Sequence, residues 1–292
     1  MAVILARLLQ SRPRARTVTG EAILAAGASQ DAAPAIRLDH VSKWFFKAGA
    51  RIAAIDDVNV DVPAGAFVTL IGPSGCGKST LFNCIAGFIA PERGAVIYRG
   101  KPVAGPNVGI GYMTQKDTLL PWRSVLANVM LPLNLQRLPT AEARERATAA
   151  IARVGLNGFA AHMPAELSGG MQKRAALARM LAYNPDTLLM DEPFGNVDVQ
   201  LKLQLQRELL ALWEGERKTV VFVTHDLEEA IALSDRVIVL SRRPGRVKAD
   251  IRVDLPRPRD PVQIRFERAF QDIHKQLWSL CDVATDAEDE HG

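Results

Sequence analysis

Residues 72–80 have the types and spacing that a loop needs to hold a chain of phosphates. They read Gly72-Pro73-Ser74-Gly75-Cys76-Gly77-Lys78-Ser79-Thr80, a glycine-rich turn that runs into Gly-Lys-Ser-Thr. Glycines let several backbone N–H groups turn inward around phosphate oxygens, and Lys78 adds a mobile cation for the same oxygens. The apolar run 67–71 supplies the strand that such loops follow. The pattern therefore predicts a nucleoside triphosphate site, in which Ser79 offers its hydroxyl to Mg²⁺.

A second candidate group consists of two adjacent carboxylates, Asp191 and Glu192, directly after the apolar run 188–190. Neighbouring strands of a sheet would bring these acids beside the phosphate loop. Asp191 would then hold Mg²⁺ through its water shell, and Glu192 would orient and deprotonate an attacking water. Acids that cap the next helix are the alternative. Because phosphoryl transfer depends mostly on positioning and charge stabilisation, these acids, a metal ion and Lys78 are sufficient for triphosphate hydrolysis.

Apolar patterns along the chain indicate the elements that position these groups. Residues 36–38 and 58–62 alternate with period two, so an antiparallel β layer is expected before the phosphate loop. Residues 140–154 carry apolar side chains at helical spacing, which predicts a helical middle region. Three further runs are almost entirely apolar, as strands buried on both faces are: 67–71, 187–190 and 219–223. The sequence therefore predicts an α/β fold.

The two ends of the chain differ from the middle in composition. Residues 1–35 are rich in Ala, Ser, Gly and Arg and are expected to form a flexible extension, with a basic membrane-surface helix as the alternative. After residue 258, a stripe of apolar side chains predicts an amphipathic terminal helix: Phe266, Phe270, Ile273, Leu277 and Leu280. We expect this helix to pack on the core, with binding to a partner as the alternative, and the acidic tail 286–292 to be disordered.

Composition limits the class of protein. The chain has 292 residues, 48% hydrophobic and 23% charged, as ordinary globular proteins do. Its formal net charge of +4 is spread along the chain, so no nucleic-acid partner is expected. No apolar run approaches the roughly 18 residues that span a bilayer. The three cysteines lack metal-ligand spacing, and the arginines near the start follow the apolar residues instead of preceding them, so a reducing, cytoplasmic location is expected.

A third string, Leu167-Ser168-Gly169-Gly170-Met171-Gln172, could open a helix whose free N–H groups grip a phosphate. With the phosphate loop and the Asp191-Glu192 pair, this string resembles the nucleotide-binding subunits of ATP-binding cassette (ABC) transporters. In that family, Ser168 and the two glycines would contact the ATP of a second subunit, which implies a head-to-tail dimer. Met171 stands where the family usually has Gln, which we interpret as subfamily variation.

The resemblance assigns roles to three further polar residues. Gln115 matches the lid glutamine that senses Mg²⁺ and couples the helical subdomain to the membrane partner. His225 matches the switch histidine that touches the γ-phosphate, although a lone histidine in this place would more commonly be a packed one. Asp198 matches an aspartate that contacts the other subunit, and Asn196-Val197 departs from the usual Ala-Leu before it.

The family also stacks adenine on an aromatic side chain near the first strands. The segment Val41 to Phe46 offers Trp44, Phe45 and Phe46, and position favours Phe45. Core packing is an open alternative for each of them, because stacking uses the same apolar faces that cores bury.

The resemblance covers residues 36–258 and implies a RecA-like P-loop NTPase core with a mixed sheet, an antiparallel β layer and a helical subdomain at about 116–180. It implies ATP and Mg²⁺ as cofactors and an ATPase in which Glu192, His225 and Lys78 are catalytic, with Ser79, Gln115 and Asp191 at the metal. Three strings are similar to importers of nitrate, alkanesulfonates, taurine and related solutes: 116–122, 191–194 and 240–246.

The implied partners are a second copy of the chain, integral membrane permease subunits and, indirectly, a solute-binding protein. The implied location is the cytoplasmic face of the cell (inner) membrane, as a peripheral subunit. An efflux subunit, a soluble ABC ATPase acting on nucleic acid and a small-molecule kinase are the alternatives. The single phosphate loop and the Ser168 string count against the last two.

Overall fold

The structure, a computed structural model, describes residues 33–115, 119–195 and 197–282. Four sequence predictions therefore fall wholly or largely outside the described residues: the 1–35 extension, the beginning of the 116–122 string, the Asn196 departure and the 286–292 tail. Ala35 is described, is buried, and donates its N–H to the carbonyl of Val62. The last residue assigned to the extension thus joins the sheet that follows it. The domain boundaries themselves stay predictions.

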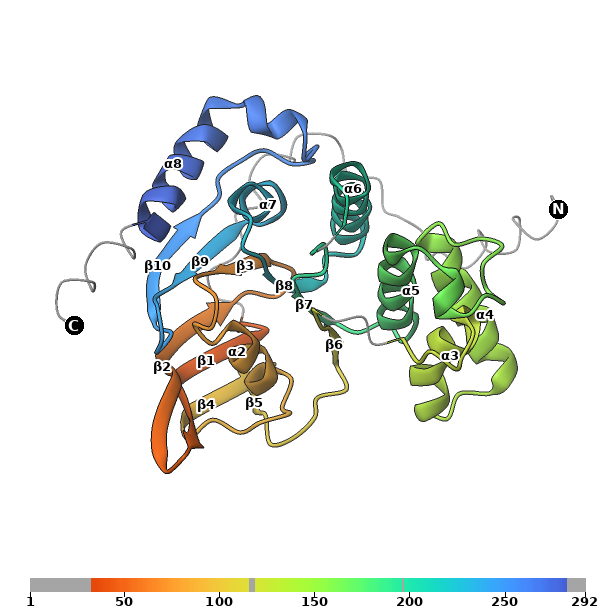
Figure 1. Ribbon diagram of the computed structural model, residues 1–292, viewed down its shortest axis with the longest axis horizontal. Coiled ribbons are helices and arrows are strands. Elements are labelled where there is room, and N and C mark those ends of the chain that lie inside the picture. Colours follow the sequence, from red (N-terminus) through yellow and green to blue (C-terminus); the bar gives the residue numbers. More distant parts are fainter. Residues whose placement is uncertain (1–32, 116–118, 196, 283–292) are drawn as a thin grey trace, which may run out of the picture. The chain divides into compact units, whose positions relative to one another are not determined.

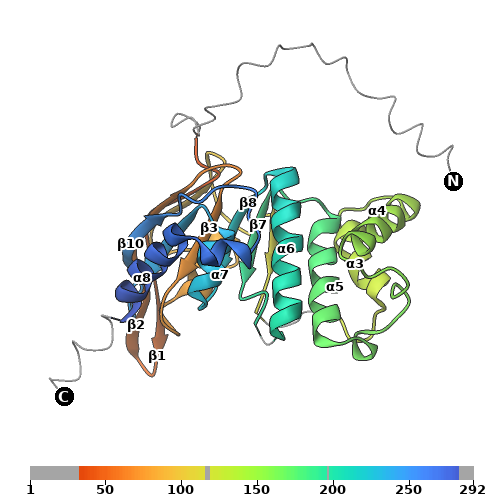
Figure 2. The same ribbon diagram turned by 90° about the horizontal axis from the view of Figure 1, so that it is seen from above.

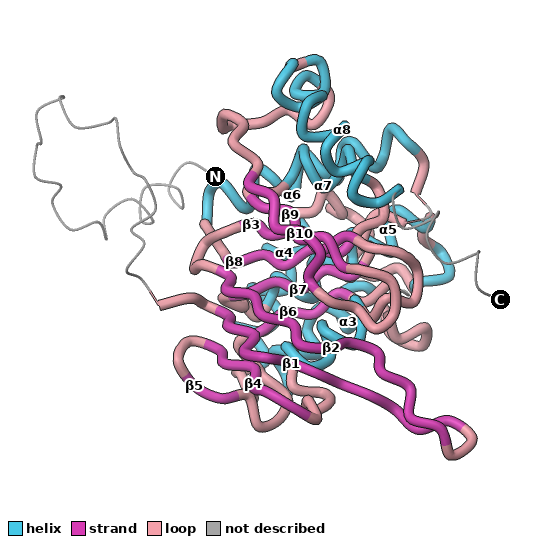
Figure 3. Tube along the Cα trace, turned by 90° about the vertical axis from the view of Figure 1, so that its left-hand side faces the viewer, coloured by secondary structure: helices cyan, strands magenta, loops and turns pink. Residues whose placement is uncertain are grey.

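A four-stranded antiparallel sheet forms the first layer and has the order β2-β1-β4-β5 (Figure 1). Its strands are β1 (Ile36–Lys47), β2 (Ala50–Val62), β4 (Arg93–Tyr98) and β5 (Lys101–Pro102). The period-two pattern of the sequence arises because Ile36 and Leu38 of β1, like Val58 and Val60 of β2, turn one face to the core. Figure 3 shows the β1–β2 hairpin extending past the other strands of its sheet.

The second sheet has six strands in the order β10-β9-β3-β8-β7-β6. β3 (Phe67–Ile71), β6 (Ile110–Met113), β7 (Thr187–Asp191), β8 (Thr219–Val223) and β9 (Arg236–Leu240) run parallel, and β10 (Val247–Arg252) is antiparallel to β9. The three apolar runs of the sequence are β3, β7 and β8, and every residue in them is buried. Because β8 separates β7 from β3, the two carboxylates lie one strand further from the phosphate loop than direct neighbours would.

The core between the two sheets joins the antiparallel layer to the phosphate loop. Val41 and Val60 of the first sheet cluster there with Val68 and Leu70 of β3. The phosphate-loop helix α2 (Lys78–Ile85) contributes its buried side chains to the same cluster, Leu81, Phe82 and Ile85. The loop is therefore held between two sheets before any ligand arrives.

Helices α3 (Val125–Leu135), α4 (Thr140–Arg153) and α5 (Gly169–Ala182) pack against one another as a separate helical group (Figure 1). The short helix η1 (Pro164–Glu166) precedes α5. A second core links this group to the sheet and to α6 (Val199–Glu216), with Trp213 of α6 packed edge-on against Phe67 of β3. Helical spacing predicted this middle region, and α4 covers the stretch that carried the pattern.

The terminal helix α8 (Arg268–Asp282) packs on α7 (Leu227–Leu233) and β9, beside the six-stranded sheet (Figure 2). Phe270 and Leu277 are buried in this third core together with Val237 of β9. Phe266 is a correction to the predicted stripe. It lies in the short helix η2 (Gln263–Phe266), before α8 begins, and its side chain is 75% exposed. Within the residues that the structure describes, no helix is long and apolar enough to cross a membrane.

Candidate nucleotide site

The phosphate loop links β3 to α2. The sequence pattern predicted a glycine-rich loop here, and the structure shows why glycine is needed at two of its positions. Gly77 has a φ of 102°, and a Cβ there would lie 2.5 Å from Ile55 Cγ2 and 2.6 Å from the carbonyl oxygen of Ala54. Gly75 has a φ of 75° with open space where a Cβ would point. The first case is a packing requirement and the second a conformational one. Together they keep the loop backbone curled between β2 and the pocket.

Lys78 lies at the start of α2 with its ammonium folded back over the loop. Its Nζ donates to the carbonyl oxygens of Gly72 at 2.7 Å and Pro73 at 2.9 Å, and lies 3.8 Å from Cys76 Sγ. These contacts hold the cation inside the curl of backbone that faces the pocket. A phosphate placed there would meet the positive end of α2 and this ammonium together.

Ser79 and Asp191 lie far apart in the sequence and are in direct contact. Ser79 Oγ donates to Asp191 Oδ2 at 2.8 Å, and Asp191 is buried. Burial raises the pKa of the Asp191 carboxyl, and the neighbouring Glu192 adds to that, while the Ser79 hydrogen bond and Lys78 oppose it. A bound cation that prefers oxygen ligands would stabilise the ionised form of this buried carboxylate.

The donor set fits Mg²⁺. One hydroxyl and one carboxylate beside a phosphate-binding loop are what that ion takes from proteins, since water and substrate phosphates supply its remaining ligands. In the described part of the chain, no cluster of three or more His, Cys, Asp or Glu side chains is placed to hold a metal. An all-protein metal cage is thus not what these residues build.

Glu192 is held by contacts from two neighbouring loops. Gln115 Nε2 donates to Glu192 Oε2 at 2.9 Å, and His225 Nδ1 lies 3.5 Å from Glu192 Oε1. The backbone of Glu192 has a φ of 47°, in the left-handed region, and its N–H donates to the carbonyl of Val223 at 2.9 Å. This backbone conformation costs a non-glycine residue about 1–3 kcal/mol, so contacts from the surrounding structure must hold Glu192 in it.

A pocket of about 490 Å³ collects most of the predicted residues in one place. Its lining consists of Phe45, Ala54, Gly72, Ser74, Gly75, Gly77, Lys78, Ser79, Thr80, Gln115, Asp191, Glu192, His225 and Arg243. Pro73 and Cys76 belong to the loop and are not in this lining. Pro73 acts through its carbonyl, and Cys76 is buried beneath the loop. The size is that of an ordinary small-molecule site.

The three aromatic candidates for adenine stacking have different surroundings. Phe45 lines the pocket and its side chain is 42% exposed. Trp44 is occupied by Arg51, whose guanidinium carbon lies 3.6 Å from the ring centroid, and Phe46 does not line the pocket. Lys43 Nζ lies 5.6 Å from the centroid of the Phe45 ring, farther than Arg51 lies from Trp44. Because Phe45 alone of the three lines the pocket, this placement favours it over its neighbours for base stacking.

Four predicted residues lie outside both this pocket and the phosphate loop: Ser168, Gly169, Gly170 and Asp198. Ser168 is exposed and caps α5, where its Oγ accepts from the N–H of Met171 at 3.3 Å. Asp198 caps α6 in the same way and accepts from the N–H of Leu201 at 2.9 Å. A Cβ on Gly170 would lie 2.0 Å from Leu201 Cδ2, so this glycine lets the two helix starts pack together. One chain therefore builds the pocket without these groups.

The sequence analysis missed one polar residue of the lining, Arg243. It lies in the turn between β9 and β10, within the 240–246 string that had been compared only with importers. No short-range pattern linked this turn to the phosphate loop. The signal that pointed to it was the concentration of Arg, Pro and Gly in one turn.

Comparisons with known proteins agree with this geometry. A family model described as "ABC transporter" matches residues 55–195. The chain is 48% identical over 231 residues to an uncharacterized ABC transporter ATP-binding protein of Methanocaldococcus jannaschii, covering 79% of this chain and 86% of that one. It is 45% identical over 256 residues to the taurine import ATP-binding protein TauB of Rhizobium johnstonii, covering 86% of this chain and 98% of TauB.

Among solved structures, the dimeric ABC transporter cassette MJ0796 superposes on this chain with a TM-score of 0.69 and 34% sequence identity. The match covers 76% of this chain and all of that one, 100%. It confirms the predicted fold class, a P-loop core with a mixed sheet, an antiparallel β layer and a group of helices. The solved relative is a dimer.

Proposed function

Because this chain belongs to the ABC transporter family, we propose that the ATP hydrolysis it performs powers import of a small solute such as nitrate, taurine or another sulfonate. The membrane permease that carries the solute is a separate protein, fed by a solute-binding protein. The likeness to TauB supports this direction and this solute class, since it extends over nearly the whole of both chains. The subunit itself does not contact the solute.

The observation that carries the proposal is the division of the predicted residues into two groups. Lys78, Glu192 and His225 line one pocket, whereas Ser168 and Asp198 lie at exposed helix starts outside it. In a head-to-tail dimer, the Ser168 end of one copy covers the pocket of the other. Each ATP is then enclosed by two chains, and closure and reopening of the dimer follow binding and hydrolysis.

Within each pocket, Ser79, Asp191 and Gln115 are the residues proposed to hold Mg²⁺. The ion, when bound, neutralises charge that develops on the transferred phosphoryl group. Glu192 accepts the proton of the attacking water, and Gln115 and His225 fix the direction of its two carboxylate oxygens. Lys78 and the loop N–H groups hold the phosphates in line for attack.

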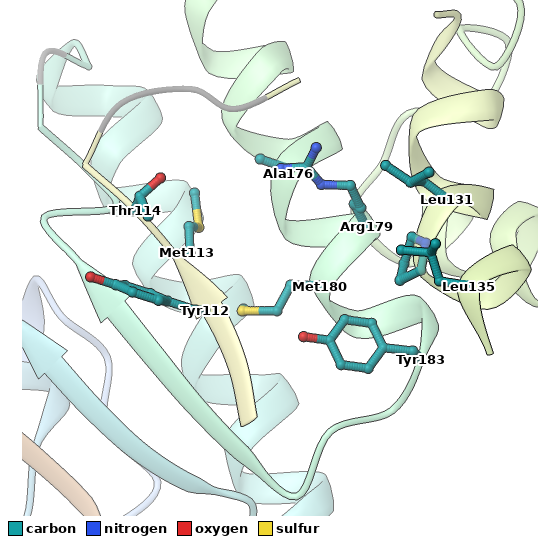
Figure 4. A pocket seen from close by; sticks show the side chains of 10 residues that line it. Tyr112, Met113, Thr114, Leu131, Leu135, Ala176, Arg179, Met180 and Tyr183 are labelled. Atoms are coloured by element: carbon teal, nitrogen blue, oxygen red, sulfur yellow. The ribbon is translucent and has the colours of Figure 1, made fainter. Parts of the chain in front are cut away.

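A second hollow, of about 180 Å³, is the proposed contact with the permease (Figure 4). Tyr112, Met113 and Thr114 of the β6 end form one wall, and Leu131 and Leu135 of α3 lie opposite (Figure 4). Pro132 of α3, Ala176, Arg179 and Met180 of α5, and Tyr183 directly after α5 complete the lining. Leu135 is 76% exposed, so an apolar side chain of the hollow is accessible to a partner. Thr114 directly precedes Gln115, which connects a permease segment seated here with Glu192.

The proposed location is the cytoplasmic face of the cell (inner) membrane, where the chain is a peripheral subunit. Its attachment goes through the permease, because the hollow beside Gln115 presents apolar side chains to a partner. Trp122, which lies between Gln115 and α3 in the sequence, is 70% exposed and is a further apolar side chain available to a partner.

A reconstitution experiment tests the proposal. The chain is co-expressed with a candidate permease, purified with it, placed in lipid vesicles and supplied with a candidate solute-binding protein. Taurine, an alkanesulfonate or nitrate is expected to stimulate ATP hydrolysis several-fold, and only when the binding protein is present. Stimulation by solute on the ATP side, without a binding protein, would instead assign an efflux system. Absence of any membrane partner during purification would overturn the transport role.

A further inference from the structure

Arg243 brings a second cation into the nucleotide pocket, from a different segment of the chain than the phosphate loop. The pocket lining contains Lys78 in the loop and Arg243 in the turn between β9 and β10. Lys78 is turned toward the carbonyls of its own loop, those of Gly72 and Pro73. Phe45, Ala54 and Arg243 are the lining residues that come from the β1–β2 hairpin and the β9–β10 turn.

The turn that carries Arg243 is fixed by two neighbours. The N–H of Gly245 donates to the carbonyl of Ala54 at 3.0 Å, and the N–H of Asp56 donates back to the carbonyl of Gly245 at 3.0 Å. A Cβ on Gly245 would lie 2.0 Å from the carbonyl oxygen of Cys76, so this residue packs directly on the phosphate loop. Arg246 adds an ion pair with Asp56 of β2. The position of Arg243 is thereby set by β2 and the loop together.

The Arg243 side chain is itself anchored. Its Nε donates to the carbonyl oxygen of Ala53 at 3.1 Å. Ala53 pairs with Trp44 across the β1–β2 ladder, and the next pair along is Ile52 with Phe45. The anchor thus lies beside the proposed base-stacking residue. Within the described residues, no protein acceptor engages the Nη nitrogens of Arg243, so its planar fork of donors is available to a ligand in the pocket that Arg243 lines.

We propose that Arg243 binds the ribose and α-phosphate of the nucleotide, between the base on Phe45 and the β- and γ-phosphates in the loop. This inference rests on the proposed nucleotide site. The part of a nucleotide that joins base to β-phosphate carries one anionic group and two hydroxyls, all of which accept hydrogen bonds from a guanidinium. ATP and ADP share this part, so Arg243 holds both nucleotides equally and does not discriminate between substrate and product.

Nucleotide titration of purified variants tests the inference. Affinity for ADP with Mg²⁺, and for ATP in EDTA so that none is hydrolysed, is measured calorimetrically for the wild type, Arg243→Ala and Arg242→Ala. Arg242 is the matched control, because it is the exposed neighbour in the same turn and does not line the pocket. Arg243→Ala is expected to lower the affinity for both nucleotides about tenfold, as loss of one charge-assisted contact does. Arg242→Ala is expected to leave both affinities unchanged.

The remaining outcomes each decide against one part of the argument. If Arg243→Ala binds ATP more weakly than the wild type but binds ADP equally well, Arg243 contacts the γ-phosphate, and the assignment is overturned. Equal affinities for Arg243→Ala and the wild type overturn it as well. The variant Lys78→Ala tests the proposed phosphate site independently of Arg243. If Lys78→Ala binds nucleotide as tightly as the wild type, the phosphate site itself is wrong, whereas a weakened Lys78→Ala beside an unaffected Arg243→Ala removes the Arg243 inference alone.

Discussion

Gln115 donates a hydrogen bond from Nε2 to Oε2 of Glu192 across 2.9 Å, joining the loop after β6 to the carboxylate after β7. These strands are parallel neighbours, with Met113 beside Met190, so their carboxyl ends bring the two side chains to the same edge of the sheet. The carbonyl of Gln115 also accepts from Lys173 of α5 at 3.0 Å. One residue therefore contacts both the helical group and the proposed general base.

Replacing Glu192 with Gln is expected to separate binding from turnover. The amide keeps the size of the side chain but does not accept a proton from water, and a positioned general base contributes about 10²–10⁴-fold to rate. ATP hydrolysis should fall by at least about 100-fold while ATP affinity stays within about threefold of the wild type, and ATP should trap a dimer visible by light scattering. Glu145→Gln, at an exposed position on α4, is the control. Rapid hydrolysis by Glu192→Gln would remove Glu192 from its role.

Replacing Ser168 with Arg tests whether the pocket is shared between two copies. Ser168 lies outside the pocket of its own chain, so the affinity of one chain for ATP is expected to stay unchanged. A bulky cation at the helix start should block closure over the partner's ATP and abolish both dimer formation and hydrolysis. Ser279→Arg, on an exposed part of α8, serves as the matched control. Full hydrolysis by Ser168→Arg would show that a single chain is sufficient.

Replacing Lys202 with Met is expected to lower the free energy of unfolding by about 2 kcal/mol, because loss of this partly buried cation removes the ion-pair partner of two carboxylates. Lys202 Nζ lies 2.7 Å from Asp226 Oδ2 and 3.3 Å from Glu229 Oε1. Urea unfolding measures the loss, and Lys101→Met at an exposed site on β5 is the control, expected within about 0.5 kcal/mol of the wild type.

The Lys202 effect should depend on pH. Burial alone raises the pKa of Asp226, but the hydrogen bond and charge of Lys202, with the N–H of Glu229, outweigh burial and hold that pKa below its usual value. A carboxyl with a lowered folded pKa stabilises the fold above the unfolded pKa of about 3.9 and loses that contribution as the pH falls through the folded value. Burial raises the pKa of Glu229, and Lys202 opposes that rise, so Glu229 becomes protonated at a higher pH without Lys202. The difference between wild type and Lys202→Met should therefore begin to shrink above the ordinary glutamate pKa of about 4.3 and continue to shrink as Asp226 is protonated. A constant difference across this range would contradict the ion-pair origin.

Replacing Arg259 with Met is expected to destabilise the packing of the segment after β10 on α7 without affecting nucleotide affinity. The Arg259 guanidinium is buried and donates to five backbone carbonyls, those of Ile231, Ser234, Val253, Leu255 and Pro256. Burial lowers its pKa to about 10, still well above neutrality. Loss of these donors leaves buried acceptors unpaired, so unfolding free energy should fall by about 3 kcal/mol. Arg252→Met, at an exposed pair with Asp254, should change it little. An equal effect of both variants would argue against the carbonyl contacts.

The sequence pattern is insufficient where the same pattern is compatible with two different structures. Trp44, Phe45 and Phe46 are equivalent as apolar faces in the sequence, and only the neighbours of each ring separate them, with Arg51 on Trp44 and the pocket beside Phe45. Phe266 fits the helical stripe of α8, yet the chain turns through η2 before that helix begins, so its side chain lies exposed. Spacing reports which face a residue occupies if the helix reaches it, and it does not report where the helix starts.

The sequence by itself determined the phosphate loop, the carboxylate pair and the helix start at Ser168, because each is a local backbone conformation that a few adjacent residues impose through their φ preferences and capping groups. Only the tertiary structure decided that Ser168 lies outside its own pocket and that Arg243 lies inside it. Both depend on strand order. Since β9 lies next to β3, the turn after it packs on the phosphate loop, whereas the helical group holds Ser168 away from that loop. Contacts between segments so distant in the chain follow from how the sheets and helices pack, which no short stretch of residues encodes.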